Sequence, residues 1–225
     1  MVAKEKLKDL TNKAITLRRH IISMTCAAAS GHPGGSLSAA DIITVLFFHF
    51  LKHDPKKPDW TERDKFVMSK GHAAPVLYAA LAEAGYFPVE YLKTLRKIGS
   101  SLQGHIDMLA CPGIEMSTGS LGQGLSAANG MALAAKLDKK DTQIYCLMGD
   151  GECQEGQVWE AAMTSAHRKL DNLIAIIDHN KFQIDGAVAD VKNVVPLDEK
   201  FKAFGWEVFR CDGHKIKDLI DTIEK

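Results

Sequence analysis

The clearest candidate for chemistry in this chain is the tripeptide Gly149-Asp150-Gly151, which follows an apolar run of residues. Its glycines let backbone N–H groups approach an anion closely, and the start of a following helix favours negative charge. An aspartate here would repel a phosphate unless a cation lay between them, so Asp150 is a candidate ligand for a divalent ion that bridges to phosphate oxygens. For the tripeptide alone, a tight turn with a solvated aspartate stays open as the alternative.

Asn180 lies 30 positions after Asp150 (180 − 150) and follows the next apolar run. One strand–helix–strand unit fits between the two residues, which would place both at the same edge of neighbouring strands. Asn180 offers an amide oxygen and Phe182 a backbone carbonyl, so with Asp150, two phosphate oxygens and a water they would complete an octahedral Mg²⁺ shell. Taken alone, Asn180 is an ordinary turn residue, and its spacing from Asp150 is what makes it a candidate.

The elements that must position these residues alternate between helix and strand. Apolar residues at steps of three and four predict a helix over residues 4–28, which a glycine-rich segment at 30–36 interrupts. Further helices are predicted at about 38–51 with Ser36 or Ser38 as the N-cap, at 73–84 ending at Gly85, at 122–137, at 154–169 and from 215. Strands are predicted at 65–68, 143–148, 173–178 and 207–210, and a loop at 100–120.

Buried apolar strands that alternate with helices indicate an α/β fold with a doubly wound, mostly parallel sheet and helices on both faces. Ligands bind at the carboxyl ends of the strands in such sheets, which is where Asp150 and Asn180 are expected. The length of 225 residues suits one large domain over residues 1–225, or less readily two small domains.

Composition argues against several classes of function. The 28 Lys and Arg residues balance the 28 Asp and Glu residues, which gives no support for nucleic-acid or membrane-surface binding. No run reaches the roughly 18 apolar residues of a membrane span, and the first residues lack an apolar signal core. The cysteines form no CxxC pair, so reduced thiols in a cytoplasmic protein are expected rather than disulfides or a structural zinc site. They are Cys26, Cys111, Cys146, Cys153 and Cys211.

Longer motifs around the candidate residues resemble a known family. The segment GDGECQEGQVWEA from residue 149 and the segment IDHNKFQIDG up to residue 186 resemble the thiamine-diphosphate signature of transketolases and related enzymes. Four more segments stand in transketolase order: SGHPGGSLSAAD, MSKGHAAPVLYA, LQGHIDM and STGSLGQGLSAANGMA. The resemblance covers nearly the whole chain and implies the N-terminal, diphosphate-binding (PP) subunit of a split transketolase. Rossmann and P-loop motifs fit worse, because GxGxxG after the first strand and GxxxxGK[ST] do not occur.

The resemblance implies roles for individual positions. His32, His72 and His105 each adjoin a glycine and resemble the active-site histidines that contact the cofactor diphosphate or the hydroxyls and carbonyl of the substrate. Neutral imidazoles exchange protons near pH 7, which suits work at a ketose carbonyl. The metal ligands implied are Asp150, Asn180 and Phe182. The cofactor contacts implied are His72, Gly119, Ser120, Leu121, Asp150, Gly151, Glu155 and Asn180.

The resemblance also implies cofactors and a reaction. The cofactors are thiamine diphosphate and Mg²⁺, for which Ca²⁺ or Mn²⁺ can substitute. Thiamine diphosphate supplies a carbanion that attacks a ketose carbonyl and stabilises the carbanion left after carbon–carbon cleavage. The implied reaction moves a two-carbon ketol unit from a ketose phosphate to an aldose phosphate.

A second chain is implied as well. In the family, a glutamate of the pyrimidine-binding domain activates the cofactor, and this sequence contains neither that domain nor the C-terminal domain. We therefore expect the partner to be a C-terminal transketolase subunit, with two copies of each chain around a homodimer core and active sites at the interfaces. The chain alone is expected to bind the cofactor weakly and to catalyse little.

Two departures from the family pattern qualify these expectations. Gly35 stands where several homologues have a serine that contacts the cofactor, and the strand and lysine-containing loop that normally follow residues 212–214 do not occur before Lys225.

Two alternatives also stay open. One is a related enzyme, such as a deoxyxylulose-phosphate synthase, a dihydroxyacetone synthase or a transketolase for a rarer sugar. The other is a non-catalytic paralogue that acts as a scaffold.

Overall fold

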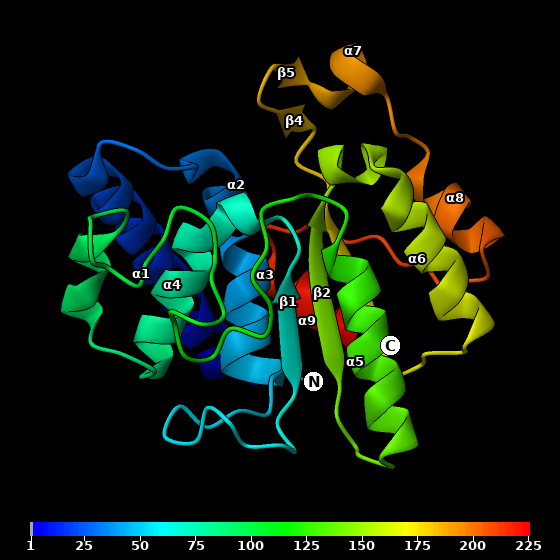
Figure 1. Cartoon of the computed structure of the whole chain (residues 1–225), viewed down its shortest axis with the longest axis horizontal. Helices are drawn as coiled ribbons and strands as arrows, with labels where there is room; N and C mark the ends of the chain where they lie inside the picture. The colour runs from blue at the N-terminus through cyan, green and yellow to red at the C-terminus, as the bar shows by residue number, and fades with distance from the viewer. Residues whose placement is uncertain (1) are drawn as a thin grey trace. The chain divides into compact units, whose positions relative to one another are not determined.

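A computed structural model describes residues 2–225 (Figure 1). The chain forms two compact units, each assembled from separate stretches of sequence. The first unit comprises the residues up to Arg63, His72–Ser117 and Arg210–Lys225, and the second comprises Asp64–Gly71 and Thr118–Phe209. The predicted histidines fall in the first unit, and the predicted metal ligands fall in the second.

The second unit is built on a parallel sheet. Its three strands are β1 (Lys65–Met68), β2 (Ile144–Gly149) and β3 (Leu173–Asp178), and β2 lies in the middle. Every residue of β2 is buried, which explains its continuous apolar sequence, because a central parallel strand has no exposed face. The parallel register pairs Gly149 with Asp178 and so brings the carboxyl ends of β2 and β3 side by side.

Helices cover this sheet and cap its edge. Figure 1 shows α5 (Gly124–Leu137) running alongside the strands, and α5 packs against β1, β2 and α6 (Gly156–His167). Its buried face is rich in alanine, which permits close approach to the strands. Beyond the strand ends lie the short hairpin of β4 (Phe182–Gln183) and β5 (Gly186–Ala187) and the helix α7 (Val188–Lys192). The 3-10 helix η4 (Gly151–Gln154) contacts α7, and α8 (Leu197–Ala203) follows in the chain.

The first unit is helical. The long helix α1 (Lys4–Ala28) packs on α3 (Ala40–Val45) and α4 (Ala74–Ala84), and its buried side chains recur at the predicted steps. Gly85 ends α4 in the left-handed conformation (φ 96°), as predicted. The remaining elements are α2 (Pro33–Ser38), the π-helix η1 (Leu46–Phe50), the 3-10 helices η2 (Gly71–Ala73, at the boundary between the units) and η3 (Val89–Thr94), and α9 (Ile216–Ile223).

Two predicted elements are wrong. Helical structure begins at Pro33 rather than near residue 38, because proline at the first helical position has its φ angle already set. Neither Ser36 nor Ser38 is an N-cap, and Ser36 donates its hydroxyl to the carbonyl of His32 (3.0 Å) inside α2.

The strand predicted at residues 207–210 does not form, and this segment has no regular structure. Trp206, the residue before this segment, contacts a helix instead of a sheet. Its indole N–H donates to the carbonyl of Ala162 in α6 (3.0 Å), and its ring packs on Phe201. The other predicted helices and strands form within a few residues of their expected bounds. All five cysteines are free thiols. Over residues 2–225, no helix is both long and apolar enough to cross a membrane.

Candidate functional site

Asp150 lies directly after β2, at the carboxyl edge of the sheet. Its side chain is buried, and each carboxylate oxygen accepts one backbone hydrogen bond: Oδ1 from Gly151 (2.8 Å) and Oδ2 from Lys181 (2.7 Å). The Asp150 N–H donates to the carbonyl of Asp178 at the end of β3 (3.3 Å). The two predicted metal-binding segments therefore meet at one sheet edge.

Asn180 forms a tight turn at this edge. Its Oδ1 accepts the N–H of Phe182 (2.9 Å), which is the geometry of an Asx turn. Lys181 adopts a left-handed backbone conformation (φ 69°), which is uncommon outside glycine. The turn directs the Lys181 N–H at Asp150, and this hydrogen bond holds the Asn180 turn beside the Asp150 carboxylate.

The oxygens gathered here fit a hard divalent cation. A carboxylate oxygen and an amide oxygen each carry two lone pairs, so Asp150 and Asn180 retain acceptor capacity after their backbone hydrogen bonds are made. Cations such as Mg²⁺ prefer oxygen donors and take several of them from phosphate and water. No group of three or more His, Cys, Asp or Glu side chains that could hold a metal ion occurs among residues 2–225. The chain thus offers one carboxylate and neutral oxygens, which suits an ion shared with a bound phosphate.

Glu152 is a buried carboxylate at this edge that the sequence reasoning missed. Its Oε2 accepts the N–H of Gly149 (3.0 Å), and its Oε1 accepts the N–H of Gly122 (2.9 Å) and the hydroxyl of Ser69. Burial raises the pKa of Glu152 above its ordinary value, and these hydrogen bonds oppose that shift. A glutamate three residues after Gly149 reaches back to a backbone N–H as in a capping box, and that spacing is the signal that could have revealed it.

A buried ion pair crosses the same edge. The Lys70 ammonium lies 2.5 Å from Asp178 Oδ2, and both side chains are almost wholly buried. Lys70 follows β1 and Asp178 ends β3, so the pair links the two outer strands across the central one. Together, the Lys70–Asp178 ion pair and the hydrogen bonds of Glu152 hold the ends of the strands in place.

The predicted cofactor contacts Gly119, Ser120 and Leu121 lie in the irregular segment before α5. This segment is held on both sides: the Thr118 hydroxyl donates to the carbonyl of Met68 (2.7 Å), and Gly122 donates to Glu152. The hydrogen bonds fix both ends of the segment, so its backbone is positioned before any ligand binds.

In the first unit, the three predicted histidines form one cluster. The His32 ring centroid lies 5.6 Å from those of both His72 and His105. Burial lowers the pKa of His32, and His105 and Arg96 lower it further, so neutral imidazole is favoured. The buried His32 Nδ1 has no hydrogen-bond partner in the described part of the chain.

Tyr78 on α4 fixes the loop that carries His105. Its hydroxyl donates to the carbonyls of Gln103 (3.1 Å) and His105 (3.4 Å). Burial raises the pKa of Tyr78, so the phenol stays protonated as a donor. The loop is therefore anchored to a buried helix, although it has no regular structure of its own.

Comparison with known proteins decides what these features belong to. Residues 11–225 match the family described as "Transketolase, thiamine diphosphate binding domain". The chain belongs to the transketolase family. This result confirms the predicted family and, at the level of the domain, thiamine diphosphate as its cofactor; the divalent metal stays a prediction.

Transketolases similar to this chain fall into two length classes. This chain is 48% identical to the 6-deoxy-6-sulfo-D-fructose transketolase subunit SqwG of Clostridium sp. over 98% of this chain and 80% of that subunit. This chain is 46% identical to an apulose-4-phosphate transketolase subunit of Actinobacillus succinogenes over 96% of this chain and 79% of that subunit. The crystal structure of Campylobacter jejuni transketolase superposes with a TM-score of 0.90 at 41% identity, over 96% of this chain but only 35% of that one. This likeness confirms the α/β fold.

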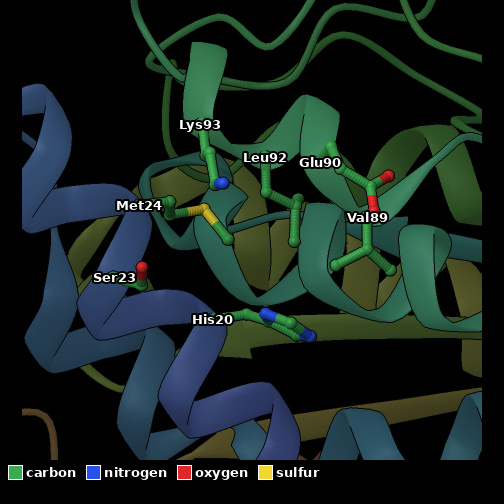
Figure 2. Close-up of a pocket in the computed structure, with 7 residues that line it drawn as sticks. All are labelled: His20, Ser23, Met24, Val89, Glu90, Leu92 and Lys93. Atoms are coloured by element: carbon green, nitrogen blue, oxygen red, sulfur yellow. The ribbon is translucent and has the colours of Figure 1, made fainter.

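The transketolase domain also has a pocket that none of the predicted residues lines. It has a volume of about 180 Å³, and Figure 2 shows it between α1 and η3 of the first unit. The His20 side chain lines it and also contacts Glu83, with Nε2 2.8 Å from Oε1. The lining residues are His20, Ser23, Met24, Val89, Glu90, Leu92 and Lys93.

Proposed function

We propose that this chain is the diphosphate-side subunit of a two-chain transketolase that transfers a ketol unit from a ketose phosphate to an aldose phosphate. The observation that carries the proposal is the Lys181–Asp150 hydrogen bond, which holds the Asn180 turn beside the buried Asp150 carboxylate. The relatives of similar length support it, because both are named transketolase subunits.

The sheet edge would hold the metal and diphosphate end of the cofactor. Asp150, Asn180 and the carbonyl of Phe182 would bind Mg²⁺, or Ca²⁺ or Mn²⁺ in its place. Gly151 would donate its N–H to the diphosphate, which requires its present bond to Asp150 to be shared or exchanged. Glu155 lies just before α6 with its side chain exposed, where it is available to a neighbouring subunit. Gly119, Ser120 and Leu121 would approach the cofactor rings through their backbone.

The histidine cluster would handle protons at the sugar. Thiamine diphosphate, when bound, supplies the carbanion chemistry. His32 favours the neutral form, so it can accept a proton from a substrate hydroxyl or share one with a carbonyl oxygen. His72 would also contact the diphosphate, and His105 lies exposed on its anchored loop, where a substrate can reach it.

The rest of the enzyme would come from a partner. We propose residues 1–225 as a single functional domain that pairs with a pyrimidine-binding subunit in the cytoplasm. Two copies of each chain would assemble around a homodimer core. The glutamate that activates the cofactor would lie on the partner, so this chain alone should be nearly inactive.

Mixing the two purified chains tests this function. The chain is co-expressed with a candidate pyrimidine-binding partner, and ketol transfer is assayed across several ketose phosphates with thiamine diphosphate and Mg²⁺. Activity that requires both chains supports the proposal. Full activity of this chain alone would contradict the need for a partner, and inactivity of every mixture, despite complex formation and cofactor binding, would contradict the proposed reaction.

A further inference from the structure

A second, larger pocket lies in the second unit, where α8 packs against α6 (Figure 1). It is open to solvent and has a volume of about 400 Å³, which is comparable with small-molecule sites in proteins. None of the residues proposed to bind the cofactor or the metal lines it. The chemistry of its lining residues therefore indicates what kind of ligand would fit.

Two aromatic side chains form an apolar wall of this pocket. Trp159 on α6 and Phe204 just after α8 are half-buried, and their ring centroids lie 6.0 Å apart. Val194 adds a buried aliphatic side chain. Aromatic rings favour contact with another planar ring, which adds to the gain from burying apolar surface. The wall therefore suits a flat aromatic molecule.

The charged residues that line the pocket are both lysines. Lys200 is half-buried, and its ammonium lies 5.7 Å from the centre of the Trp159 ring. It donates to the carbonyl of Val194 (2.7 Å), which leaves two of its three donors for a ligand. Lys192 is exposed, and the acidic residues of α7 and α8 do not line the pocket. The lining thus favours a negative charge beside the aromatic wall.

Cys153 also lines the pocket, but its thiol is not prepared for covalent chemistry. The thiol is buried and donates to the carbonyl of Gly149 (3.5 Å). Burial raises the pKa of Cys153, the carboxylates of Glu152 and Asp150 raise it further, and Lys200 opposes them. A thiol with a raised pKa stays protonated and is a poor nucleophile. A ligand would therefore be held without a covalent bond.

Hydrogen bonds fix the walls of the pocket before a ligand binds. The Trp159 indole N–H donates to the carbonyl of Cys153 (3.0 Å). The Gln154 amide donates both to Gln183 Oε1 (2.6 Å) and to the carbonyl of Lys192 (2.7 Å). A pocket that is already ordered loses less conformational entropy on binding.

We propose that this pocket binds a small aromatic carboxylate. The ring would lie against Trp159 and Phe204, and the carboxylate would accept hydrogen bonds from the Lys200 ammonium. Hydrogen bonds between two charged groups are stronger than those between neutral groups, so the lysine gives the pocket its preference for an acid. Occupancy of the pocket does not depend on the proposed reaction.

Titration of the full chain with 2-naphthoate tests the pocket. The chain has three tryptophans, Trp60, Trp159 and Trp206, whose indole N–H signals are followed by NMR. Addition of 2-naphthoate should shift the Trp159 signal saturably and leave that of Trp60, in the first unit, unchanged. The absence of a saturable shift at Trp159, or an equal shift at Trp60, would overturn the proposal.

A neutral probe and one variant then separate the charge from the shape of the pocket. The wild-type chain should bind 2-naphthoate about tenfold more tightly than the uncharged 2-naphthamide. Lys200→Met keeps an apolar side chain, so it should remove this preference and leave 2-naphthamide binding unchanged. Lys202→Met, on the exposed face of the same helix, is the matched control and should preserve the preference.

Three results would contradict the role of Lys200. The first is equal affinity of the wild-type chain for the two probes. The second is equal weakening of both probes by Lys200→Met, which would show that the variant deforms the pocket through the lost bond to Val194. The third is an equal loss of preference in Lys202→Met, which would assign the effect to the general surface charge.

Discussion

The sheet edge of the second unit and the histidine cluster of the first satisfy their polar groups in opposite ways. At the sheet edge, Asp150, Glu152 and Asp178 are buried and hydrogen-bonded, and Lys70 pairs with one of them. In the histidine cluster, the buried Nδ1 of His32 has no partner in the described chain, and His105 and Arg96 are exposed.

The difference teaches what each region is prepared to bind. The buried carboxyl groups of Asp150, Glu152 and Asp178 outnumber the buried ammonium of Lys70 at the sheet edge, which suits a cation that in turn attracts phosphate. The histidine cluster favours a neutral imidazole at His32 and exposes His105, which suits the hydroxyl and carbonyl oxygens of a sugar. The sheet edge is held in place by hydrogen bonds to its buried carboxyl groups, whereas the histidine cluster leaves the buried Nδ1 of His32 without a partner in the described chain.

Asp150→Asn should give the largest effect on binding. The amide keeps the shape but removes the charge that attracts the metal, so affinity for Mn²⁺ together with thiamine diphosphate should fall about 100-fold. Isothermal titration of the two-chain complex measures it. Asp190→Asn, at an exposed position of α7, is the matched control. Wild-type affinity in Asp150→Asn would remove this residue from the proposed metal site.

Lys70→Met should give the largest effect on folding. It leaves the Asp178 carboxylate buried without its cation, at a cost of about 3 kcal/mol in the free energy of unfolding. Urea denaturation measures the change, and Lys202→Met on the exposed face of α8 serves for comparison. The double variant Lys70→Met/Asp178→Asn should lose less than the sum of the single variants. Strict additivity would mean that the pair does not act as a unit.

Glu152→Gln should have a smaller effect. The amide group turns a donor toward atoms that themselves donate, so one of the three bonds is lost and unfolding becomes easier by about 1–2 kcal/mol. Hydrogen exchange should quicken at the amides of Gly122 and Gly149 in particular. Glu199→Gln on α8 is the control. Unchanged exchange at both glycines would show that Glu152 does not tie the loop to the strand.

The smallest effect concerns pH and His32. Because its folded-state pKa lies below the ordinary value of 6.5, the unfolded chain takes up the proton first as the pH falls. His32 should therefore leave stability unaffected well above pH 6.5 and lower it as the pH falls from there toward the folded pKa. The pH dependence of urea denaturation should flatten in His32→Gln but not in the exposed-site variant His167→Gln. An identical slope in wild type and His32→Gln would contradict the lowered pKa.

The sheet edge was predictable because its residues follow strands directly. A parallel strand pattern determines where each strand ends, so the apolar runs before Asp150 and Asn180 were enough to bring these residues to one edge. Glu152 was missed although its spacing of three residues from Gly149 is a local signal, because its bond to Gly122 crosses 30 positions. Lys70 and Asp178 were not found because they pair across 108 positions of the sequence.

The histidine cluster was harder to derive from the residues alone. His32, His72 and His105 lie in separate loops without periodicity, and only the family resemblance grouped them before the ring distances were known. Arg96 gave no signal, because its electrostatic effect on His32 depends on how the intervening loop folds and not on a sequence spacing. The false strand at residues 207–210 has a similar origin, since its neighbouring Trp206 packs on α6 instead of a sheet.

The most direct test of the sheet edge as the metal and diphosphate anchor is paramagnetic broadening by Mn²⁺ in the presence of thiamine diphosphate. Amide signals of the full chain are recorded by NMR at substoichiometric Mn²⁺. The account predicts that Gly151, Lys181 and Phe182 broaden first and that Asp150→Asn abolishes this pattern. Broadening centred on residues away from this edge, or an unchanged pattern in Asp150→Asn, would contradict it.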